Sequence, residues 1–145
     1  MKILVINGPN MNMLGLREPE IYGNVTYAGL VDMIREEGDL LGVETGFYQS
    51  NHEGDLVDKI QEAYGTFDGI IINPAAYTHT SVAILDAVKS VGIPTVEVHV
   101  SDPDKRDEFR KISYIRQACI ATVKGKGLPG YIEALHILKE YIESK

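Results

Sequence analysis

The stretch FDGIIINPAAYTHT, residues 67–80, decides how the rest of the chain is interpreted. Its three consecutive isoleucines, Ile70 to Ile72, form a short continuous apolar run of β-branched side chains. Such a run is typical of a strand buried on both faces, as strands of a parallel sheet are. The polar residues from Asn73 to His79 would then lie at the carboxyl end of that strand.

Four similar apolar runs, separated by amphipathic helical patterns, predict four more strands at about 3–6, 43–48, 95–100 and 119–123. Helices are expected near 27–41, 56–64, 82–91 and 131–142, with a shorter one over 105–111. Thr26 is a plausible N-cap of the first helix and Gly42 its C-terminal stop. Gly65 and Gly92 stop the next two.

The β–α order, repeated about five times, predicts an α/β fold. Right-handed crossovers make it a flavodoxin-like, doubly wound sheet of five parallel strands in three α/β/α layers. The chain has 145 residues, which suits a single domain spanning 1–145. An eight-fold barrel needs about 200 residues or more.

Composition narrows the class of protein. The chain is 44% hydrophobic and 24% charged, as globular proteins are. Its net charge of −7 repels nucleic acid and acidic membranes, so neither is expected as a partner. The one cysteine, Cys119, excludes an internal disulfide and is read as a small buried residue. The N-terminal apolar run is too short for a signal peptide or a membrane span, so a cytoplasmic location is predicted.

Polar residues gather where the predicted strands end, at 7–23, 49–54, 73–81 and 99–104. Ligands of open α/β sheets bind beyond the carboxyl ends of the strands. These four loops therefore predict an active site.

The first of these loops, about 8–23, is much longer than the roughly 2–6 residues usual for such a connection. We expect either a functional lid or a disordered insertion. It contains Arg17 and Tyr22. A tyrosine base needs its pKa lowered by about three units, which a close guanidinium in a dry site can supply. The spacing also fits, and by itself favours, a tyrosine that packs the loop and a solvated arginine. Asn10 is either a turn residue or an amide that binds water or an oxyanion.

The later loops carry further candidates. Asn73 ends its strand and could bind a hydroxyl group, and Thr80 or Ser81 could cap the next helix. His99 ends the fourth strand, where a histidine is either a satisfied core residue or a catalyst. Segment 49–54, which includes Glu53, caps a helix or supports the first loop.

A second group of candidates carries charge or binds anions. Ser101 and its backbone N–H could bind a carboxylate. Arg106 and Arg110, expected on one face of the short helix, would supply positive charge that the chain as a whole lacks. Asp86 lies on the helix after His79 and could be only solvated.

Several common motifs are absent. The first loop has no GxxxxGK[ST] or GxGxxG and so is not a phosphate loop, which argues against nucleotide binding there. None of its four histidines has metal-site spacing, and GxSxG is missing, so neither a metal nor a serine nucleophile is predicted.

Four segments together resemble the type II 3-dehydroquinate dehydratases. They are ILVINGPNMNMLGLREPEIYG, FYQSNHEGDLVDKI, INPAAYTHTSVAILDAV and VEVHVSDPDKRDEFR, in family order over about residues 2–113. The resemblance implies conversion of 3-dehydroquinate to 3-dehydroshikimate and water in the shikimate pathway, without a cofactor. It also implies a homododecamer built as a tetramer of trimers.

The resemblance further implies a role for each matching residue. Tyr22 would be the general base, Arg17 the residue that keeps it ionised, His99 the general acid and Asn10 the stabiliser of an enolate. The implied substrate ligands are Asn73, His79, Arg110 and the backbone of Val100 and Ser101, with Asp86 reaching the substrate of a neighbouring subunit. Arg106 and Glu53 would be supporting residues.

The chain departs from the family pattern at Ala75, Asp104, Lys111-Ile112 and 123–127. These departures bear on supporting contacts and assembly more than on chemistry. Two other functions stay open at this point. One is a binder of quinate-like ligands without turnover, and the other is a flavin or phospho-acceptor module on the same fold.

Overall fold

The computed structural model describes residues 1–16, 19–22 and 24–145, without the side chains of Ile21 and Tyr22. Its strands are β1 (Lys2–Asn7), β2 (Glu44–Gln49), β3 (Gly69–Asn73), β4 (Thr95–His99) and β5 (Ala121–Lys124). Its α-helices are α1 (Pro19–Tyr22), α2 (Tyr27–Leu41), α3 (Glu53–Glu62), α4 (Val82–Val91) and α5 (Pro129–Glu143). Short 3-10 turns are η1 (Met11–Met13), η2 (Ala75–His79), η3 (Pro103–Lys105), η4 (Glu108–Lys111) and η5 (Ile115–Ala118).

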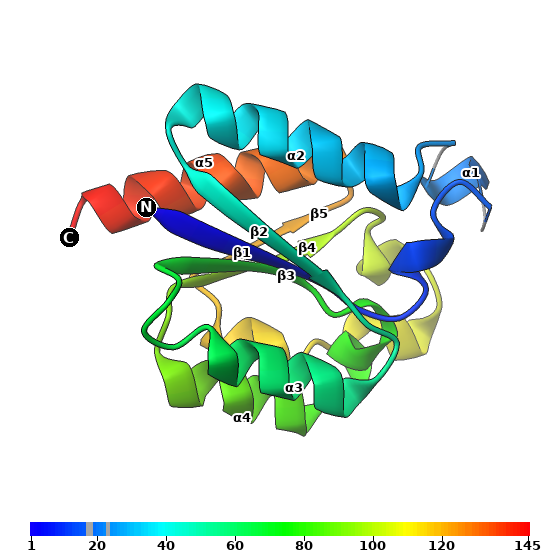
Figure 1. Ribbon diagram of the computed structural model, residues 1–145. Coiled ribbons are helices and arrows are strands. Elements are labelled where there is room, and N and C mark those ends of the chain that lie inside the picture. Colours follow the sequence, from blue (N-terminus) through cyan, green and yellow to red (C-terminus); the bar gives the residue numbers. More distant parts are fainter. Residues whose placement is uncertain (17–18, 23) are drawn as a thin grey trace.

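The five strands form one parallel sheet in the order β2-β1-β3-β4-β5. The order reverses between β1 and β3, where the register pairs Asn7 with Asn73. Helices α2 and α5 cover one face of the sheet, and α3 and α4 cover the other (Figure 1). The predicted α/β fold of five parallel strands in three layers is confirmed.

Alternation along the central strands builds a core on each face. Ile3 and Val5 pack under α2 and α5, whereas Leu4 and Ile6 point to α3 and α4. All four side chains are buried, because successive strand residues face opposite sides of a covered sheet.

Helices α2 and α4 end at the predicted glycines, Gly42 and Gly92, whereas α3 begins earlier than predicted and ends at Glu62, before Gly65. The Thr26 hydroxyl accepts the N–H of Gly29 at 3.1 Å, and Gly42 ends α2 with φ of 70°. Of the two candidate caps of α4, the structure uses Ser81, whose hydroxyl accepts the N–H of Ile84 at 3.0 Å.

The helix expected over 105–111 is wrong. The segment forms two separate 3-10 turns, η3 and η4. Arg106 lies between them at φ −101° and ψ −142°, which is outside the helical region and interrupts the hydrogen-bond ladder. Arg106 and Arg110 therefore do not share one helical face.

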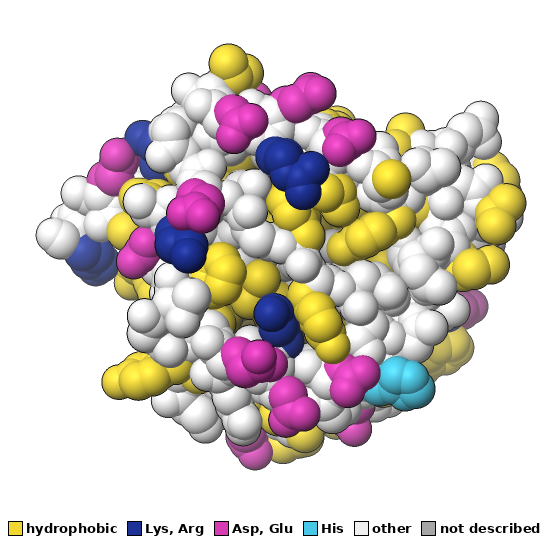
Figure 2. All heavy atoms as spheres, in the orientation of Figure 1, with side chains coloured by type: hydrophobic (Ala, Val, Ile, Leu, Met, Phe, Trp, Pro, Cys, Tyr) yellow, Lys and Arg dark blue, Asp and Glu magenta, His cyan; other side chains and the backbone are white. Residues whose placement is uncertain are grey.

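The surface carries charges of both signs. Figure 2 shows acidic side chains along the α2 side of this view, with basic side chains lying among apolar ones below. Arg35 and Lys59 lie over the rings of Phe47 and Tyr48, at 5.2 and 5.3 Å from the ring centroids. These contacts place positive charge on the edge strand β2, which discourages pairing with another sheet. Each helix in the described part of the chain is too short or too polar to cross a membrane.

Candidate active site

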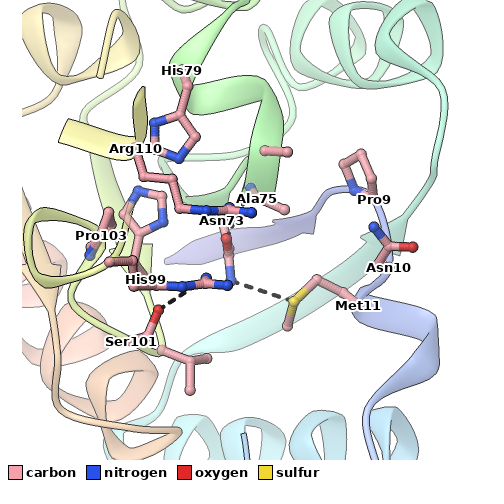
Figure 3. Close-up of a pocket in the computed structure, with 13 residues that line it drawn as sticks. Pro9, Asn10, Met11, Asn73, Ala75, His79, His99, Ser101, Pro103 and Arg110 are labelled. Carbon is pink, nitrogen blue, oxygen red and sulfur yellow. Dashed lines mark hydrogen bonds between the residues drawn. The ribbon is translucent and has the colours of Figure 1, made fainter. Parts of the chain in front are cut away.

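A pocket opens at the carboxyl edge of the sheet, beside the point where the strand order reverses (Figure 3). Its volume is about 110 Å³. The loops after β1, β3 and β4 contribute all of its walls. The lining residues are Pro9, Asn10, Met11, Asn73, Ala75, Ala76, His79, His99, Val100, Ser101, Pro103, Arg106 and Arg110.

The wall from β4 contains a histidine held by a buried carboxylate. His99 Nε2 lies 2.6 Å from Glu97 Oε2, and both side chains are almost fully buried. The two residues are separated by one position on the strand, so their side chains point to the same face. Because a carboxylate only accepts, Nε2 must donate, which leaves Nδ1 as the nitrogen free for a ligand.

Glu97 is stabilised as an anion by several further donors. The hydroxyls of Thr78 and Ser113 each donate to Oε2 at 2.7 Å. The hydroxyl of Thr122 donates to Oε1 at 3.1 Å, and Arg116 Nε donates to the same oxygen at 3.3 Å.

Burial alone would raise the pKa of Glu97. The hydrogen bond and charge of His99, with the hydrogen bonds from Ser113 and Thr78, outweigh that effect and lower the pKa of Glu97 to about 2. The ionised Glu97 carboxylate therefore lies against Nε2 of His99 and fixes which ring nitrogen faces the pocket.

A second histidine faces the pocket from η2. His79 Nδ1 donates to the carbonyl oxygen of Ile112 at 2.7 Å, which leaves Nε2 for a ligand. Burial lowers the pKa of His79, and the positive charges of His99 and Arg110 lower it further. A neutral His79 can accept a hydrogen bond from a ligand hydroxyl through Nε2.

The segment after β4 places positively charged side chains at the pocket. Arg106 Nη1 donates to the Ser101 hydroxyl at 3.5 Å, and Arg110 Nε donates to Asp107 at 3.3 Å. The segment itself is held by the loop before α5. Gly125 N donates to the carbonyl oxygen of Ser101 at 3.1 Å, and Gly127 N donates to that of Val100 at 3.0 Å. This combination of guanidinium groups and a hydroxyl suits a carboxylate ligand.

The opposite wall comes from the ends of β1 and β3. Asn73 is buried, and its Nδ2 lies 3.5 Å from the sulfur of Met11. Asn10 has φ of 71°, a conformation that asparagine tolerates better than most residues. Its backbone N–H donates to Asn51 Oδ1 at 3.0 Å, and Gln49 Nε2 donates to the carbonyl oxygen of Gly8 at 3.2 Å. The loop after β2 thus supports the start of the first loop.

The arrangement provides a proton donor, cations for a carboxylate, and hydrogen-bonding groups for hydroxyls. Over the described residues, no three or more His, Cys, Asp or Glu side chains are grouped so as to hold a metal ion.

Comparison with known proteins assigns the family. The sequence model of the family described as "Dehydroquinase class II" matches residues 1–139. The chain belongs to this family.

Individual relatives agree with the assignment. The chain is 55% identical over 146 residues to a 3-dehydroquinate dehydratase of Clostridium perfringens, with both chains covered completely. It is 53% identical to a 3-dehydroquinate dehydratase of Caldicellulosiruptor saccharolyticus, over 97% of this chain and 98% of the other. It also matches a crystal structure of a type II dehydroquinase from Butyrivibrio crossotus, with a TM-score of 0.94 and 55% identity over 96% of this chain and 97% of that one.

Eight of the residues predicted from the sequence line the dehydroquinase pocket: Asn10, Asn73, His79, His99, Val100, Ser101, Arg106 and Arg110. Glu53 and Asp86 do not line it. Glu53 is the first residue of α3, and Asp86 is exposed on α4. Arg17 and the side chain of Tyr22 lie outside the described residues, so their predicted roles, and that of segment 8–23 as a lid, stay predictions.

Glu97 is the main functional residue that the sequence interpretation missed. Two features of the sequence could have identified Glu97. It is a charged residue within an apolar strand, and it precedes His99 by two positions, which puts both side chains on one face. Of the candidates in segment 49–54, the structure finds support for the first loop from Gln49 and Asn51 rather than from Glu53.

Two departures from the family pattern contact each other. Asp104 and Lys124 form an ion pair, and Lys124 also lies 3.8 Å from Asp102. The hydrogen bond from Lys124 is the largest cause of a lowered pKa at Asp104. The pair links η3 to the end of β5.

Proposed function

We propose that this dehydroquinase dehydrates 3-dehydroquinate to 3-dehydroshikimate in the shikimate pathway. The observation that carries the proposal is the Glu97–His99 pair, whose free nitrogen lines a pocket equipped for a hydroxylated ring carboxylate. The substrate is a β-hydroxy ketone with an acidic hydrogen at C2 and a leaving hydroxyl at C1.

The reaction follows in two proton transfers. Tyr22, as the phenolate kept ionised by Arg17, takes the proton from C2, and the electron pair passes to the C3 carbonyl oxygen to give an enolate. His99 then donates its proton to the C1 hydroxyl, which leaves as water while the C1–C2 double bond forms. Each positioned proton transfer contributes about 10²–10⁴-fold. Tyr22 ends protonated and His99 neutral, and exchange with solvent restores both.

The other pocket residues bind the substrate. Arg106, Arg110 and Ser101, with the backbone of Val100, would hold the carboxylate. His79 and Asn73 would hold ring hydroxyls, and Asn10 would stabilise the enolate through a water molecule. None of these roles needs a cofactor.

The same proposal includes a single catalytic domain over 1–145 in a cytoplasmic homododecamer, built as a tetramer of trimers. In this assembly exposed Asp86 would contact the substrate of a neighbouring subunit. Light scattering gives the assembly mass, and a monomeric active enzyme would contradict the role of Asp86.

The test is growth of enone absorbance when 3-dehydroquinate is added to metal-free protein treated with borohydride. Growth of the signal establishes dehydration without a metal or a Schiff base. A flat trace from folded protein, with ligand binding detected by calorimetry, supports a binder without turnover instead.

Two variants separate the proton transfers. Tyr22→Phe should lose most turnover and keep binding, whereas His99→Asn should still exchange the C2 hydrogen with solvent while releasing water slowly. Loss of C2 exchange in His99→Asn contradicts this division of roles.

A further inference from the structure

Tyr131 is fully buried on α5, yet its hydroxyl belongs to a chain of hydrogen bonds that ends in the pocket. The hydroxyl donates to Asn7 Oδ1 at 2.6 Å and accepts from Asn73 Nδ2 at 2.9 Å. Asn7 and Asn73 are register partners at the ends of β1 and β3. A residue 58 positions away in the sequence therefore contacts the side chain of a pocket residue.

A backbone N–H fixes the direction of the hydrogen bonds at Asn73. The backbone N–H of Ala75 can only donate, and it donates to Asn73 Oδ1 at 3.0 Å. The amide nitrogen of Asn73 must then be the atom that faces Tyr131. Tyr131 uses its single hydrogen on Asn7 Oδ1, while Asn7 Nδ2 faces the hydroxyl of Tyr27 at 3.5 Å. The N–H of Ala75 therefore fixes one orientation of the Asn73 amide, and the hydrogen bonds of Tyr131 are consistent with it.

Tyr131 also keeps its proton. Burial raises its pKa well above the ordinary value, more than the hydrogen bond from Asn73 lowers it. The group therefore stays a neutral hydroxyl that donates one hydrogen bond and accepts another.

This orientation leaves the second N–H of Asn73 on the pocket side, beside the Met11 sulfur (Figure 3). A thioether is a weak acceptor, so a ligand oxygen can take its place. We propose that Tyr131 is a positioning residue, which orients the Asn73 amide so that this N–H donates to a substrate hydroxyl. The inference rests on the proposed function, because it assumes a hydroxylated ring in the pocket.

Removing the hydroxyl should weaken substrate binding more than chemistry. In Tyr131→Phe, the Asn73 amide keeps the N–H of Ala75 and the weak acceptor sulfur of Met11 but loses its hydroxyl partner. We expect KM for 3-dehydroquinate to rise about three- to tenfold, the equivalent of one neutral hydrogen bond. We expect kcat to stay within about twofold, because loss of a contact made equally in the ground and transition states changes KM alone. Tyr64→Phe, at a largely exposed tyrosine, is the matched control and should leave KM unchanged.

A double-mutant cycle distinguishes positioning from a general effect on packing. If Tyr131 acts through Asn73, Tyr131→Phe should not raise KM further in the Asn73→Ala background. The same rise in both backgrounds overturns the proposal, as does a KM in Tyr131→Phe within twofold of the wild-type value.

Nuclear magnetic resonance tests the inference without turnover. The side-chain NH₂ protons of Asn73 should exchange slowly with solvent in the wild-type protein and at least tenfold faster in Tyr131→Phe. Equal exchange rates overturn the proposal. A wild-type protein that shows this protection but no turnover would refute the proposed function and leave Tyr131 as the residue that orients Asn73.

A second variant keeps the test decisive if Tyr131→Phe does not fold. Asn7→Ala removes the acceptor of the Tyr131 hydroxyl, whose hydrogen is then free to turn toward Asn73. The same rise in KM and faster amide exchange are expected, and wild-type values for both overturn the proposal.

Discussion

Two walls of the same pocket are organised by different kinds of interaction. The β4 wall places His99 through a buried carboxylate, Glu97, which accepts hydrogen bonds from five side chains. The wall formed by the ends of β1 and β3 is organised by close backbone contact and by the neutral hydrogen bonds through Tyr131. The difference indicates that the group proposed to move a proton is oriented by charge, whereas the groups proposed to bind the ring are placed by neutral hydrogen bonds and close packing.

The wall formed by the ends of β1 and β3, called the backbone wall below, has little room for additional atoms. Gly8 N donates to the carbonyl oxygen of Asn73 at 2.8 Å. A Cβ atom on Gly8 would lie 2.6 Å from the carbonyl oxygen of Pro74. Asn10 and Ala75 both have positive φ, at 71° and 53°. We therefore expect the β4 wall to respond most strongly to loss of a charge, and the backbone wall to respond most strongly to added bulk.

The largest expected effect is a loss of turnover when the β4 wall is changed at Glu97. Glu97→Gln keeps the shape of the side chain but removes the negative charge that lies against Nε2 of His99. We expect kcat to fall by about 10²–10⁴-fold, the usual contribution of a positioned general acid, with a smaller change in KM. Steady-state kinetics with 3-dehydroquinate measures both.

The control is Glu44→Gln, the same substitution at the exposed first residue of β2. It should leave kcat unchanged. A kcat for Glu97→Gln within threefold of the wild-type value would mean that the buried charge does not assist His99.

The second effect tests the backbone wall. In Gly8→Ala the new methyl group must displace the main chain at Pro74, because no flexible side chain can move aside. We expect a loss of about 3 kcal/mol in the free energy of unfolding, within the range for overpacked sites. We also expect lower kcat/KM, since Asn73 lies beside the displaced segment. Urea unfolding and kinetics measure the two effects.

Gly54→Ala is the matched control. Gly54 lies in the first turn of α3, and a Cβ there meets nothing within 4 Å. Alanine is the better helix former, so stability should be unchanged or higher. Equal stability of Gly8→Ala and Gly54→Ala would contradict the close-contact description of this wall.

Acid should remove the contribution that Glu97 in the β4 wall makes to the free energy of unfolding. The pKa of Glu97 is lowered from 4.5 to about 2 in the folded chain. Its stabilising contribution is therefore complete above pH 4.5 and is lost as the pH falls from about 4.5 to 2. A lowering of this size corresponds to about 3 kcal/mol of unfolding free energy. Urea unfolding at several pH values should show a shallower decline for Glu97→Gln than for wild type, whereas identical slopes would rule out Glu97 as the source.

The sequence predicts the elements that depend on local patterns. Apolar runs locate β1 and β3, and Thr26, Gly42 and Gly92 mark helix ends, because strand burial and capping are properties of neighbouring residues. The edge strand β5 was placed about two residues early, since η5 continues to Ala118 and the chain enters the sheet only at Ala121.

Contacts between distant residues could not be predicted in the same way. The site residues that line the pocket were recovered largely through resemblance to a family. The donors to Glu97 span Thr78 to Thr122, and Tyr131 meets Asn73 from across the sheet. Such contacts depend on how the helices pack on the sheet. Local sequence patterns do not predict this packing. The break at Arg106 was missed because the spacing of its neighbours fits a helix as well as two turns.

The smallest predicted effect sharpens the description of the backbone wall. Ala75 has φ of 53°, which is in the left-handed region. A left-handed conformation costs a non-glycine residue roughly 1–2 kcal/mol, whereas glycine loses about 0.5–1 kcal/mol through the entropy of the unfolded chain. Ala75→Gly should therefore stabilise the fold by about 0.5–1 kcal/mol, seen as a rise of roughly 1–4 °C in Tm.

The neighbouring Ala76 is the matched control, because it lines the same pocket without a positive φ. Ala76→Gly brings the entropic cost of glycine without relief of strain, so its Tm should fall. Opposite signs at two adjacent alanines would show that backbone conformation, rather than side-chain contact, determines the stability of this wall. A fall in Tm for both variants would mean that the left-handed turn at Ala75 carries no recoverable strain.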